Sequence, residues 1–333
     1  MKKQTILGVL CLLHLTTATA QPDTGIDKAL VQPRCRIIVD NDFGGDPDGL
    51  FLLAQQFLSP TAPVKGIICS HHYHTSKRYP GNVAHAHKMV DELLNVMNIK
   101  DVAVYEGTDS SLTNPNKPIE TPAAKAIIEE AMRTDNTPLY VVCGAGLTNI
   151  ASAYLMKPEI AKRITAVVWI GGVEYQDLCR TQVLPLREYN QGIDPIASQV
   201  VFNHSDLNIW QIPRDTYRQP LYSYAELKHR IGKAGRTGEY LMSRLDTLLR
   251  EDGGHLGEAY VLGDSPLVLV TALQTSWDMD AASCEYVVRP TPLINDAGFY
   301  DANPDGRPIR IFTKIDSRLL LEDLIAKLNL LDD

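Results

Sequence analysis

The sequence predicts an α/β protein with an open, mostly parallel sheet and helices on both faces, in a doubly wound arrangement. Short apolar runs rich in β-branched residues alternate at least four times with longer segments of helical pattern, which is typical of repeated strand–helix units. After the first 20 residues, roughly 310 residues remain, enough for one large domain with a substantial core. We therefore expect a single domain over residues 21–333.

Residues 1–20 have the features of a secretory signal peptide. Lys2 and Lys3 precede an apolar run at 6–15 that is too short to span a bilayer, and a small-residue cleavage site follows at 18–20. We expect the mature protein to be exported, to the periplasm or the medium. No later segment approaches transmembrane length, so the sequence predicts no membrane anchor.

Charge and cysteine content exclude two further classes. The net charge is −8 and no basic cluster is present, which argues against a nucleic-acid partner. The cysteines after the signal segment are odd in number and widely spaced, which fits neither a zinc site nor a disulfide framework, although one pair could bridge in an oxidising compartment. These residues are Cys35, Cys69, Cys143, Cys179 and Cys284.

The first half of the chain alternates strands and helices as the fold requires. Each expected strand is a short apolar run that ends in turn residues, and each expected helix is longer and has a polar side. The expected strands are 37–39, 64–69, 102–105 and 138–143, and the expected helices are 50–58, 81–98 and 122–132. A glycine-rich turn at 144–150 follows the fourth strand.

The second half continues the pattern less regularly. Asp194 is expected to cap a helix that has Pro195 at its first position. A long helical region at 223–250 is expected to be interrupted at Gly232, Gly235 and Gly238, since glycine is a poor helix former. Further strands are expected at 166–170, 208–212, 286–289 and 309–316, and further helices at 267–273 and 318–331.

An aspartate-rich stretch follows the first strand. Asp40, Asp42, Asp46 and Asp48 lie within nine residues, separated by Gly-Gly and Pro. Carboxylates crowded in this way repel one another unless backbone amides or a bound cation neutralise them, and aspartate oxygens suit a hard cation such as Ca²⁺. Ligands of open α/β sheets bind beyond the carboxyl ends of the strands, so the position agrees. The alternative is a turn whose carboxylates cap the following helix.

Residues 40–48, Asp-Asn-Asp-Phe-Gly-Gly-Asp-Pro-Asp, resemble the N-terminal signature of the inosine-uridine-preferring nucleoside hydrolase family. Residues 146–151, Gly-Leu-Thr-Asn-Ile-Ala, are similar to that family's second signature, and weaker similarity extends over the mature chain. The resemblance implies a Ca²⁺-dependent enzyme that cleaves the N-glycosidic bond of nucleosides. It also implies a possible homo-oligomer, since related enzymes are usually dimers or tetramers.

The resemblance also implies roles for individual residues. The expected metal ligands are Asp42, Asp48, Asp264 and the backbone carbonyl of Gly144, and Asp42 is also the expected catalytic base. In the family, Glu-aromatic-Asn holds sugar hydroxyls. The expected substrate-binding residues are Asp46, Glu188 and Asn190 for the sugar, and His72, Tyr73 and His255 are added as candidates near the leaving base.

Two departures from the family pattern affect the expected activity. Pyrimidine-accepting members place a histidine immediately before the distal aspartate to protonate the leaving base, and this chain has Gly263 there. Purine nucleosides are therefore expected over pyrimidine nucleosides. The substitutes to consider are His255, His72 and His74 as acids and Tyr73, Tyr175 and Tyr240 as stacking groups.

The second departure concerns the first signature, which commonly ends in Asp-Asp but here ends in Asp48-Gly49. Either Pro47 is an insertion and both carboxylates survive, or one ligand is lost. The alternative functions are a non-catalytic or carbohydrate-binding relative and a hydrolase of another ribosyl or glycosyl compound. A phosphohydrolase with Asp40 as nucleophile fits less well, because Phe43 follows the Asp-x-Asp where haloacid-dehalogenase-like proteins expect glycine.

Overall fold

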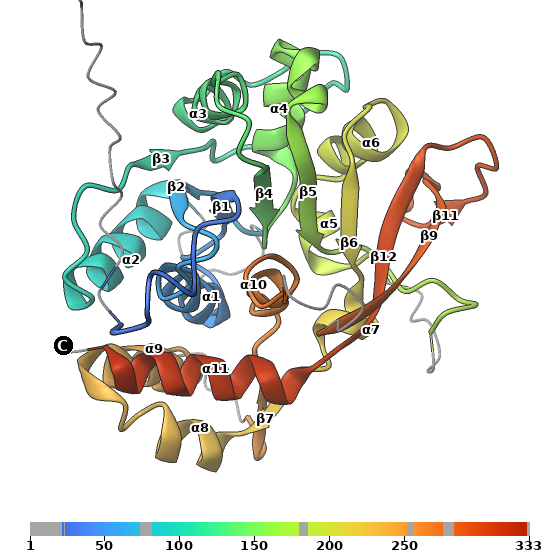
Figure 1. Ribbon diagram of the computed structural model, residues 1–333. Helices are drawn as coiled ribbons and strands as arrows, with labels where there is room; N and C mark the ends of the chain where they lie inside the picture. Colours follow the sequence, from blue (N-terminus) through green and yellow to red (C-terminus); the bar gives the residue numbers. More distant parts are fainter. Residues whose placement is uncertain are drawn as a thin grey trace, which may run out of the picture.

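The computed structural model describes residues 22, 24–73, 82–179, 186–251, 256–275 and 283–331. Its centre is an eight-stranded sheet in the order β3-β2-β1-β4-β5-β6-β12-β9 (Figure 1). β9 pairs antiparallel with β12, while the other neighbouring strands of this sheet pair in parallel. The predicted α/β class with a mostly parallel sheet is therefore confirmed. The predicted signal segment at 1–20 lies outside the described residues.

The predicted strands and helices occur where the sequence pattern placed them, with small shifts at the ends, and several short elements occur that were not predicted. The first half contains β1 (Arg36–Asn41), α1 (Asp48–Phe57), β2 (Val64–Cys69), α2 (Val83–Val96), β3 (Val104–Glu106), α3 (Pro122–Ala131), β4 (Leu139–Cys143) and α4 (Thr148–Met156). Next come the 3-10 helix η1 (Pro158–Lys162), β5 (Ile164–Ile170), α5 (Tyr189–Ile193), α6 (Pro195–Asn203), β6 (Ile209–Ile212) and α7 (Arg214–Tyr217).

The last third of the chain adds two small antiparallel pairs beside the main sheet. Its elements are β7 (Leu221–Ser223), α8 (Tyr224–Arg230), α9 (Gly235–Glu251), β8 (Ala259–Val261), α10 (Pro266–Thr271), β9 (Cys284–Pro290), β10 (Leu293–Ile294), β11 (Tyr300–Asp301), β12 (Pro308–Ile315) and α11 (Ser317–Leu330). β7 pairs with β8 and β10 with β11. In the part of the chain that the structure describes, no helix is both long enough and apolar enough to cross a bilayer.

Three local expectations can be compared with the structure. Asp194 caps α6 as predicted, since its Oδ1 accepts the N–H of Ala197 at 2.9 Å. The predicted interruption at Gly238 is wrong, because this residue lies inside α9, where a Cβ would press directly on the carbonyl of Ile231. Close packing against the end of α8, rather than a helix break, explains the glycine. The five cysteines after the signal segment are all free, so no disulfide bridges them.

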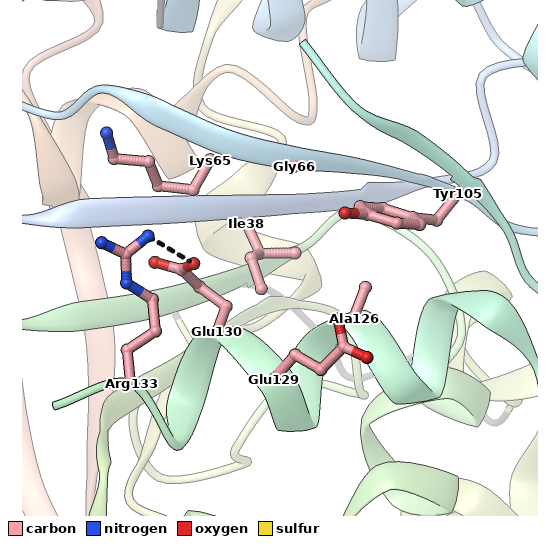
Figure 2. A pocket seen from close by; sticks show the side chains of 8 residues that line it. All are labelled: Ile38, Lys65, Gly66, Tyr105, Ala126, Glu129, Glu130 and Arg133. Atoms are coloured by element: carbon pink, nitrogen blue, oxygen red, sulfur yellow. Dashed lines mark hydrogen bonds and ion pairs between the residues drawn. The ribbon is translucent and has the colours of Figure 1, made fainter. Parts of the chain in front are cut away.

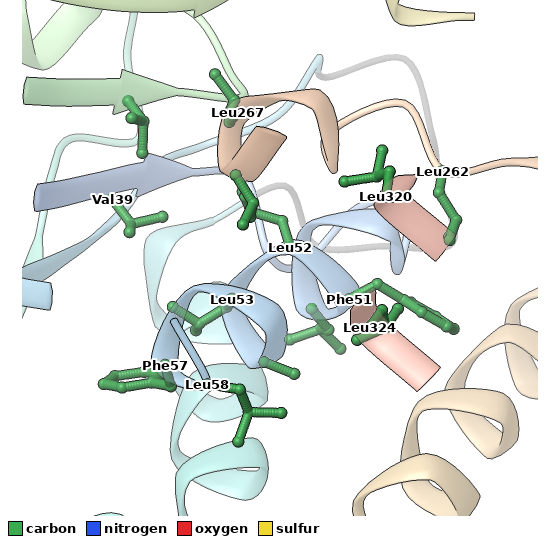
Figure 3. Close-up of a cluster of buried hydrophobic side chains, with 14 of the residues drawn as sticks. Val39, Phe51, Leu52, Leu53, Phe57, Leu58, Leu262, Leu267, Leu320 and Leu324 are labelled. Atoms are coloured by element: carbon green, nitrogen blue, oxygen red, sulfur yellow. The ribbon is translucent and has the colours of Figure 1, made fainter. Parts of the chain in front are cut away.

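Two hydrophobic layers cover the sheet, one on each face. Along β1, Ile37 and Val39 belong to one buried cluster and Ile38 to the other, as the two-residue period of a strand requires. The first cluster contains residues of α1, α2, α10 and α11, and the second contains residues of α3, α4 and α6. Figure 3 shows the first cluster, where Phe51 of α1 lies near Leu324 of α11. Burial on both faces therefore fixes β1 at the centre.

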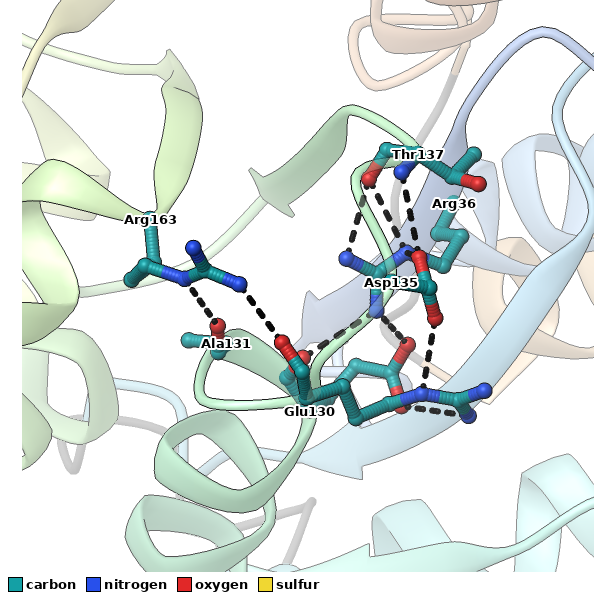
Figure 4. Close-up of polar contacts among 7 residues, drawn as sticks. Arg36, Glu130, Ala131, Asp135, Thr137 and Arg163 are labelled. Atoms are coloured by element: carbon teal, nitrogen blue, oxygen red, sulfur yellow. Dashed lines mark hydrogen bonds and ion pairs between the residues drawn. The ribbon is translucent and has the colours of Figure 1, made fainter.

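The amino end of β1 is closed by paired charges. Arg36 donates from Nη1 to Glu130 Oε1 at 2.6 Å and from Nη2 to the carbonyl of Thr137 at 2.9 Å (Figure 4). Its Nε also lies 3.3 Å from Asp135 Oδ1. A cavity of about 150 Å³ lies nearby between α3 and strands β1 to β3, lined in part by Lys65 and Arg133 (Figure 2). At this end of the sheet, the basic side chains of Arg36 and Arg133 thus lie beside the acidic side chains of Glu130 and Asp135.

Candidate active site

The candidate site lies where the direction of strand addition reverses. From β1 the chain builds β2 and β3 on one side, and from β4 it builds β5 and β6 on the other. The ends of β1 and β4 therefore diverge and leave a crevice at their carboxyl edge, which is where ligands of open α/β sheets bind. Asp40, Asn41 and Asp42 stand at the end of β1, and Gly144 directly follows β4. Sheet topology thus brings two distant signatures together.

A pocket of about 390 Å³ opens at this edge. The four predicted metal-binding residues all line it, although they come from three separate parts of the chain. Its lining residues are Asp42, Gly45, Asp46, Asp48, His72, Gly144, Ile170, Glu188, Tyr189, Asn190, Tyr217, Leu248, Gly263 and Asp264. The volume lies within the range of small-molecule sites.

The pocket carries an excess of carboxyl groups. Asp42, Asp46, Asp48, Glu188 and Asp264 line it, and no Lys or Arg does so among the described residues. Burial, followed by the charge of Asp264, raises the pKa of Asp42 well above its usual range, and the same two causes act on Asp48. Burial also raises the pKa of Asp264 to about 7. The carboxyl groups therefore carry their charges at a cost that a bound cation would remove.

The chemistry of these donors fits a hard cation. Carboxylate and backbone carbonyl oxygens are the ligands that Ca²⁺ takes, and the pocket offers Asp42, Asp48, Asp264 and the carbonyl of Gly144. In the described residues, no three His, Cys, Asp or Glu side chains already stand close enough together to hold a metal ion. Asp264 Oδ2 also accepts a hydrogen bond at 2.7 Å from Asn41 Nδ2. The oxygen donors suit Ca²⁺, but their side chains would have to move closer together to bind one ion.

The predicted sugar-binding residues surround the same space. Asp46 is exposed, lines the pocket and accepts a hydrogen bond from the hydroxyl of Tyr260. Glu188 is buried, where its Oε2 accepts the N–H of Gly172 at 2.8 Å and its Oε1 accepts the hydroxyl of Tyr217 at 2.8 Å. Asn190 donates to the carbonyl of Ile170 at 2.8 Å. Local bonds thus fix the orientations of Glu188 and Asn190 in the ligand-free chain.

The residues expected near the base are only partly in place. His72 lines the pocket and is buried, whereas Tyr73 lies at its margin, 40% exposed and with its ring centroid 6.1 Å from that of Tyr189. Tyr175 stacks on Tyr300 outside this pocket. The hydroxyl of Tyr240 donates to Glu92, also outside it. His74 and His255 lie outside the described residues.

The environment of Asp40 argues against a phosphohydrolase. Asp40 is fully buried, its Oδ1 accepts the hydroxyl of Ser70 at 2.5 Å, and its Oδ2 accepts Asn149 Nδ2 at 3.2 Å. Burial raises its pKa to about 7, against the smaller opposing effect of these hydrogen bonds. A nucleophile must reach the substrate, and Asp40 does not line the pocket. Its role is to tie β1 to β2 and α4 beneath the site.

Sequence reasoning missed several residues of the site, and three of them carry polar side chains. Tyr189 and Tyr217 line the pocket, and Asn41 lies beneath it in contact with Asp264. The position of Asn41 between two aspartates on a strand end was a usable signal, because alternation places its side chain on the face opposite Asp40. Nothing in the local sequence marks Tyr217, whose place depends on how α7 follows β6.

The doubly wound sheet and the acidic crevice at its switch point define a class of α/β protein that binds a small polar ligand at the carboxyl edge. Residues 37–293 match the model of the inosine-uridine preferring nucleoside hydrolase family, which is most of the chain. The chain belongs to this family.

Individual relatives agree over shorter segments. The inosine-uridine preferring nucleoside hydrolase of Leishmania major is 32% identical over 125 residues, which cover 37% of this chain and 38% of the relative. The enzyme of the same name from Crithidia fasciculata is 38% identical over 97 residues, which cover 29% of this chain and 28% of the relative. The matched segments thus span well under half of either relative.

Solved structures agree over nearly the whole length. A plant nucleoside hydrolase has a TM-score of 0.70 at 19% identity, covering 89% of this chain and 99% of its own. A purine-preferring ribonucleoside hydrolase from Gardnerella vaginalis has a TM-score of 0.65 at 19% identity, covering 88% of this chain and 98% of its own. At such low identity these similarities establish the shared fold.

Proposed function

We propose that this chain hydrolyses the N-glycosidic bond of ribonucleosides to free base and ribose, depends on Ca²⁺ and prefers purine to pyrimidine nucleosides. The observation that carries the proposal is the pocket at the switch point of the sheet. Five carboxyl groups line it without a Lys or Arg among the described residues, in a chain of the nucleoside hydrolase family. A reaction that develops positive charge on a sugar is the chemistry that such a pocket favours.

The cation would be held by Asp42, Asp48, Asp264 and the carbonyl of Gly144. When bound, Ca²⁺ supplies a water of lowered pKa and a fixed place for two sugar hydroxyls. Burial, followed by the charge of Asp264, raises the pKa values of Asp42 and Asp48, and a cation bound between these carboxylates would offset both effects.

The residues of the chain supply the remaining chemistry. Asp42 accepts the proton of the attacking water, for which an ionised carboxylate within hydrogen-bond reach is required. As the glycosidic bond breaks, the sugar approaches an oxocarbenium ion, and the surrounding carboxylates stabilise its positive charge. Asp46, Glu188 and Asn190 orient the sugar hydroxyls, and the hydrogen bonds that already hold Glu188 and Asn190 reduce the entropy lost on binding.

The base would leave toward the rim that carries His72, Tyr73 and Tyr189. The rings of Tyr73 and Tyr189, whose centroids lie 6.1 Å apart, are exposed and offer an aromatic surface to a planar base. Gly263 supports the purine preference, since it provides no side chain at the position where pyrimidine-accepting members of the family carry a histidine. A purine is the better leaving group when no dedicated acid stands at that position.

The test measures ribose release from inosine, adenosine, guanosine, uridine and cytidine, with Ca²⁺ and with a chelator. Asp42→Asn serves as the inactive variant, and Asp305→Asn, on the exposed surface, as the matched control. We expect chelator-sensitive release from purine nucleosides that Asp42→Asn abolishes and Asp305→Asn leaves unchanged.

Other results would redirect the proposal. Equal release from uridine would contradict the purine preference. No release from any nucleoside, together with a Ca²⁺-induced rise in melting temperature, would indicate a non-catalytic relative or a hydrolase of another glycosyl compound. Release that persists in excess chelator would overturn the calcium dependence.

We also propose that the protein is exported and acts as a homo-oligomer. The pattern of residues 1–20 supports export. N-terminal sequencing of protein recovered from outside the cytoplasm tests it, and a start near Gln21 is the expected result. Light scattering of the purified chain tests the oligomeric state.

A further inference from the structure

The side chain of Asn41 occupies an unusual place beneath the pocket. It is 1% exposed, and its Nδ2 donates to Asp264 Oδ2 at 2.7 Å, across 223 positions of sequence. This hydrogen bond weakens the rise in the pKa of Asp264 that burial causes. One carboxylate oxygen of Asp264 is therefore already taken by a neutral donor, and the carboxylate is held in a defined orientation.

Two glycines make room for this side chain. A Cβ at position 49 would lie 2.8 Å from Asn41 Oδ1, closer than real Cβ contacts allow, and a Cβ at position 144 would press directly on Asn41 Nδ2. Both contacts are with the terminal amide of Asn41, which is buried and held by its hydrogen bond to Asp264. Gly49 lies in the first turn of α1, so any other residue there would displace the Asn41 amide or move the helix.

We propose that Asn41 is a positioning residue that orients Asp264 for the cation, and that Gly49 is present to admit the Asn41 side chain. The inference rests on the proposed function only in taking calcium as the ion that the site binds. On this view the glycine at position 49 leaves the space that the Asn41 side chain requires. Asp48 still lines the pocket, where its Oδ2 accepts the N–H of Asp264 at 3.1 Å.

A substitution at position 49 distinguishes the proposal from an effect of helix propensity alone. Alanine is a better helix former than glycine, so helix propensity alone predicts that Gly49→Ala raises the melting temperature without affecting calcium. If Gly49 serves Asn41, the new methyl group displaces the amide from Asp264 and weakens calcium binding. The two effects are measured separately.

The experiment is a double-mutant cycle on the full chain, with Ca²⁺ affinity measured by titration calorimetry and melting temperature measured with and without Ca²⁺. The variants are Asn41→Ser, Gly49→Ala and the double variant. The two controls are Gly66→Ala, in β2 next to Tyr105, and Asn203→Ser, whose amide binds the backbone of Ile294 at 2.8 and 2.9 Å. These controls cause the same chemical changes away from the pocket.

We expect each single substitution at 41 or 49 to weaken Ca²⁺ binding by roughly tenfold, the size of one lost hydrogen bond to a charged group. The double variant should be no weaker than Asn41→Ser, because without the amide the methyl group has nothing to displace. The controls should lower the melting temperature at most. Calcium affinities unchanged in Asn41→Ser, or additive losses in the double variant, would overturn the proposal, and so would absence of Ca²⁺ binding by the wild-type chain.

The outcome separates this inference from the proposed function. Calcium binding that depends on Asn41, in a chain that releases no ribose from any nucleoside, would leave the inference standing and overturn the function. Ribose release that needs calcium, with affinity unaffected by Asn41→Ser, would do the reverse.

Discussion

The two ends of strand β1 hold charge in opposite ways. At the amino end, Arg36 is buried and its guanidinium meets Glu130, Asp135 and the carbonyl of Thr137 (Figure 4). At the carboxyl end, the charge of Asp42 is opposed by that of Asp264, and no Lys or Arg lines the pocket among the described residues. The strand between them is fully buried. The same element therefore carries paired charge at its amino end, whereas at its carboxyl end the described residues place no Lys or Arg in the lining of the acidic pocket.

The difference shows which end is built for stability and which for a ligand. At the amino end, burial acts to raise the pKa of Asp135, but the charge of Arg36 and the hydrogen bond from the N–H of Thr137 outweigh it, so the pKa is lowered. At the carboxyl end, burial and mutual repulsion raise the pKa values of Asp42 and Asp48. A fold tolerates such crowding when something outside the chain neutralises it, and perturbed carboxyl groups in a pocket are typical of functional sites.

The largest expected effect is that of Asp42→Asn, which should separate activity from stability. Removing the proposed base should lower ribose release by roughly 10²–10⁴-fold. The same change removes a charge that Asp264 repels, so the melting temperature of the metal-free protein should rise. Steady-state assays and thermal melts in chelator measure the two effects. A fall in the metal-free melting temperature would contradict the view that this end of the strand is strained by charge.

Arg36→Met should have the second largest effect and only on stability. It removes the closer and more buried of the two guanidinium partners of Glu130, whose side chain is 14% exposed, which should lower the free energy of unfolding by about 3 kcal/mol. Ribose release per folded molecule should not change, because Arg36 lies at the other end of β1 from the pocket. Urea denaturation and active-site-normalised rates provide the measurements. A comparable loss of rate would mean that the two ends are coupled.

The pH dependence of the metal-free protein sharpens the same contrast. The pKa of Asp264 is raised to about 7 in the folded chain, whereas in the unfolded chain it is about 4. The folded state binds the proton of Asp264 more tightly than the unfolded state does. The free energy of unfolding therefore falls as pH rises from about 4 to about 7, and above about 7 the loss is complete. The difference in melting temperature between Asp264→Asn and the wild type should therefore grow over this range in chelator. A difference in melting temperature that does not change with pH would contradict the raised pKa of Asp264.

Arg133→Gln should have the smallest effect of the four. Arg133 pairs with Glu130 at 3.4 Å and with Asp135 at 3.1 Å, but its side chain is 50% exposed. Solvent screens such pairs, so the loss should stay below about 1 kcal/mol. Comparison with Arg36→Met in the same denaturation series then shows whether burial, rather than the number of ion pairs, makes the amino end stable. Equal losses in the two variants would count against burial.

Much of the architecture was predictable from the sequence. The strands 64–69 and 138–143, the turn after Cys143 and the cap at Asp194 were all expected, and the structure contains them. These features depend on hydrophobic period, turn residues and capping groups within a few positions, which the chain specifies locally. Gly238 misled the same reasoning, because its glycine answers a contact with the carbonyl of Ile231 and not a local break.

The candidate site was only partly predictable. Its aspartates are visible as a cluster in the sequence, and the family resemblance adds Gly144 and Asp264. The contacts that complete it join distant residues, such as Asn41 with Asp264 and Tyr260 with Asp46. Sequence alone thus determined which strand ends carry the candidate residues, since the runs of β-branched residues and the polar residues that follow them are local patterns. Only the tertiary structure decided that the Asn41 side chain fills the space at Gly49, because its amide is held there by Asp264, 223 residues away in the sequence.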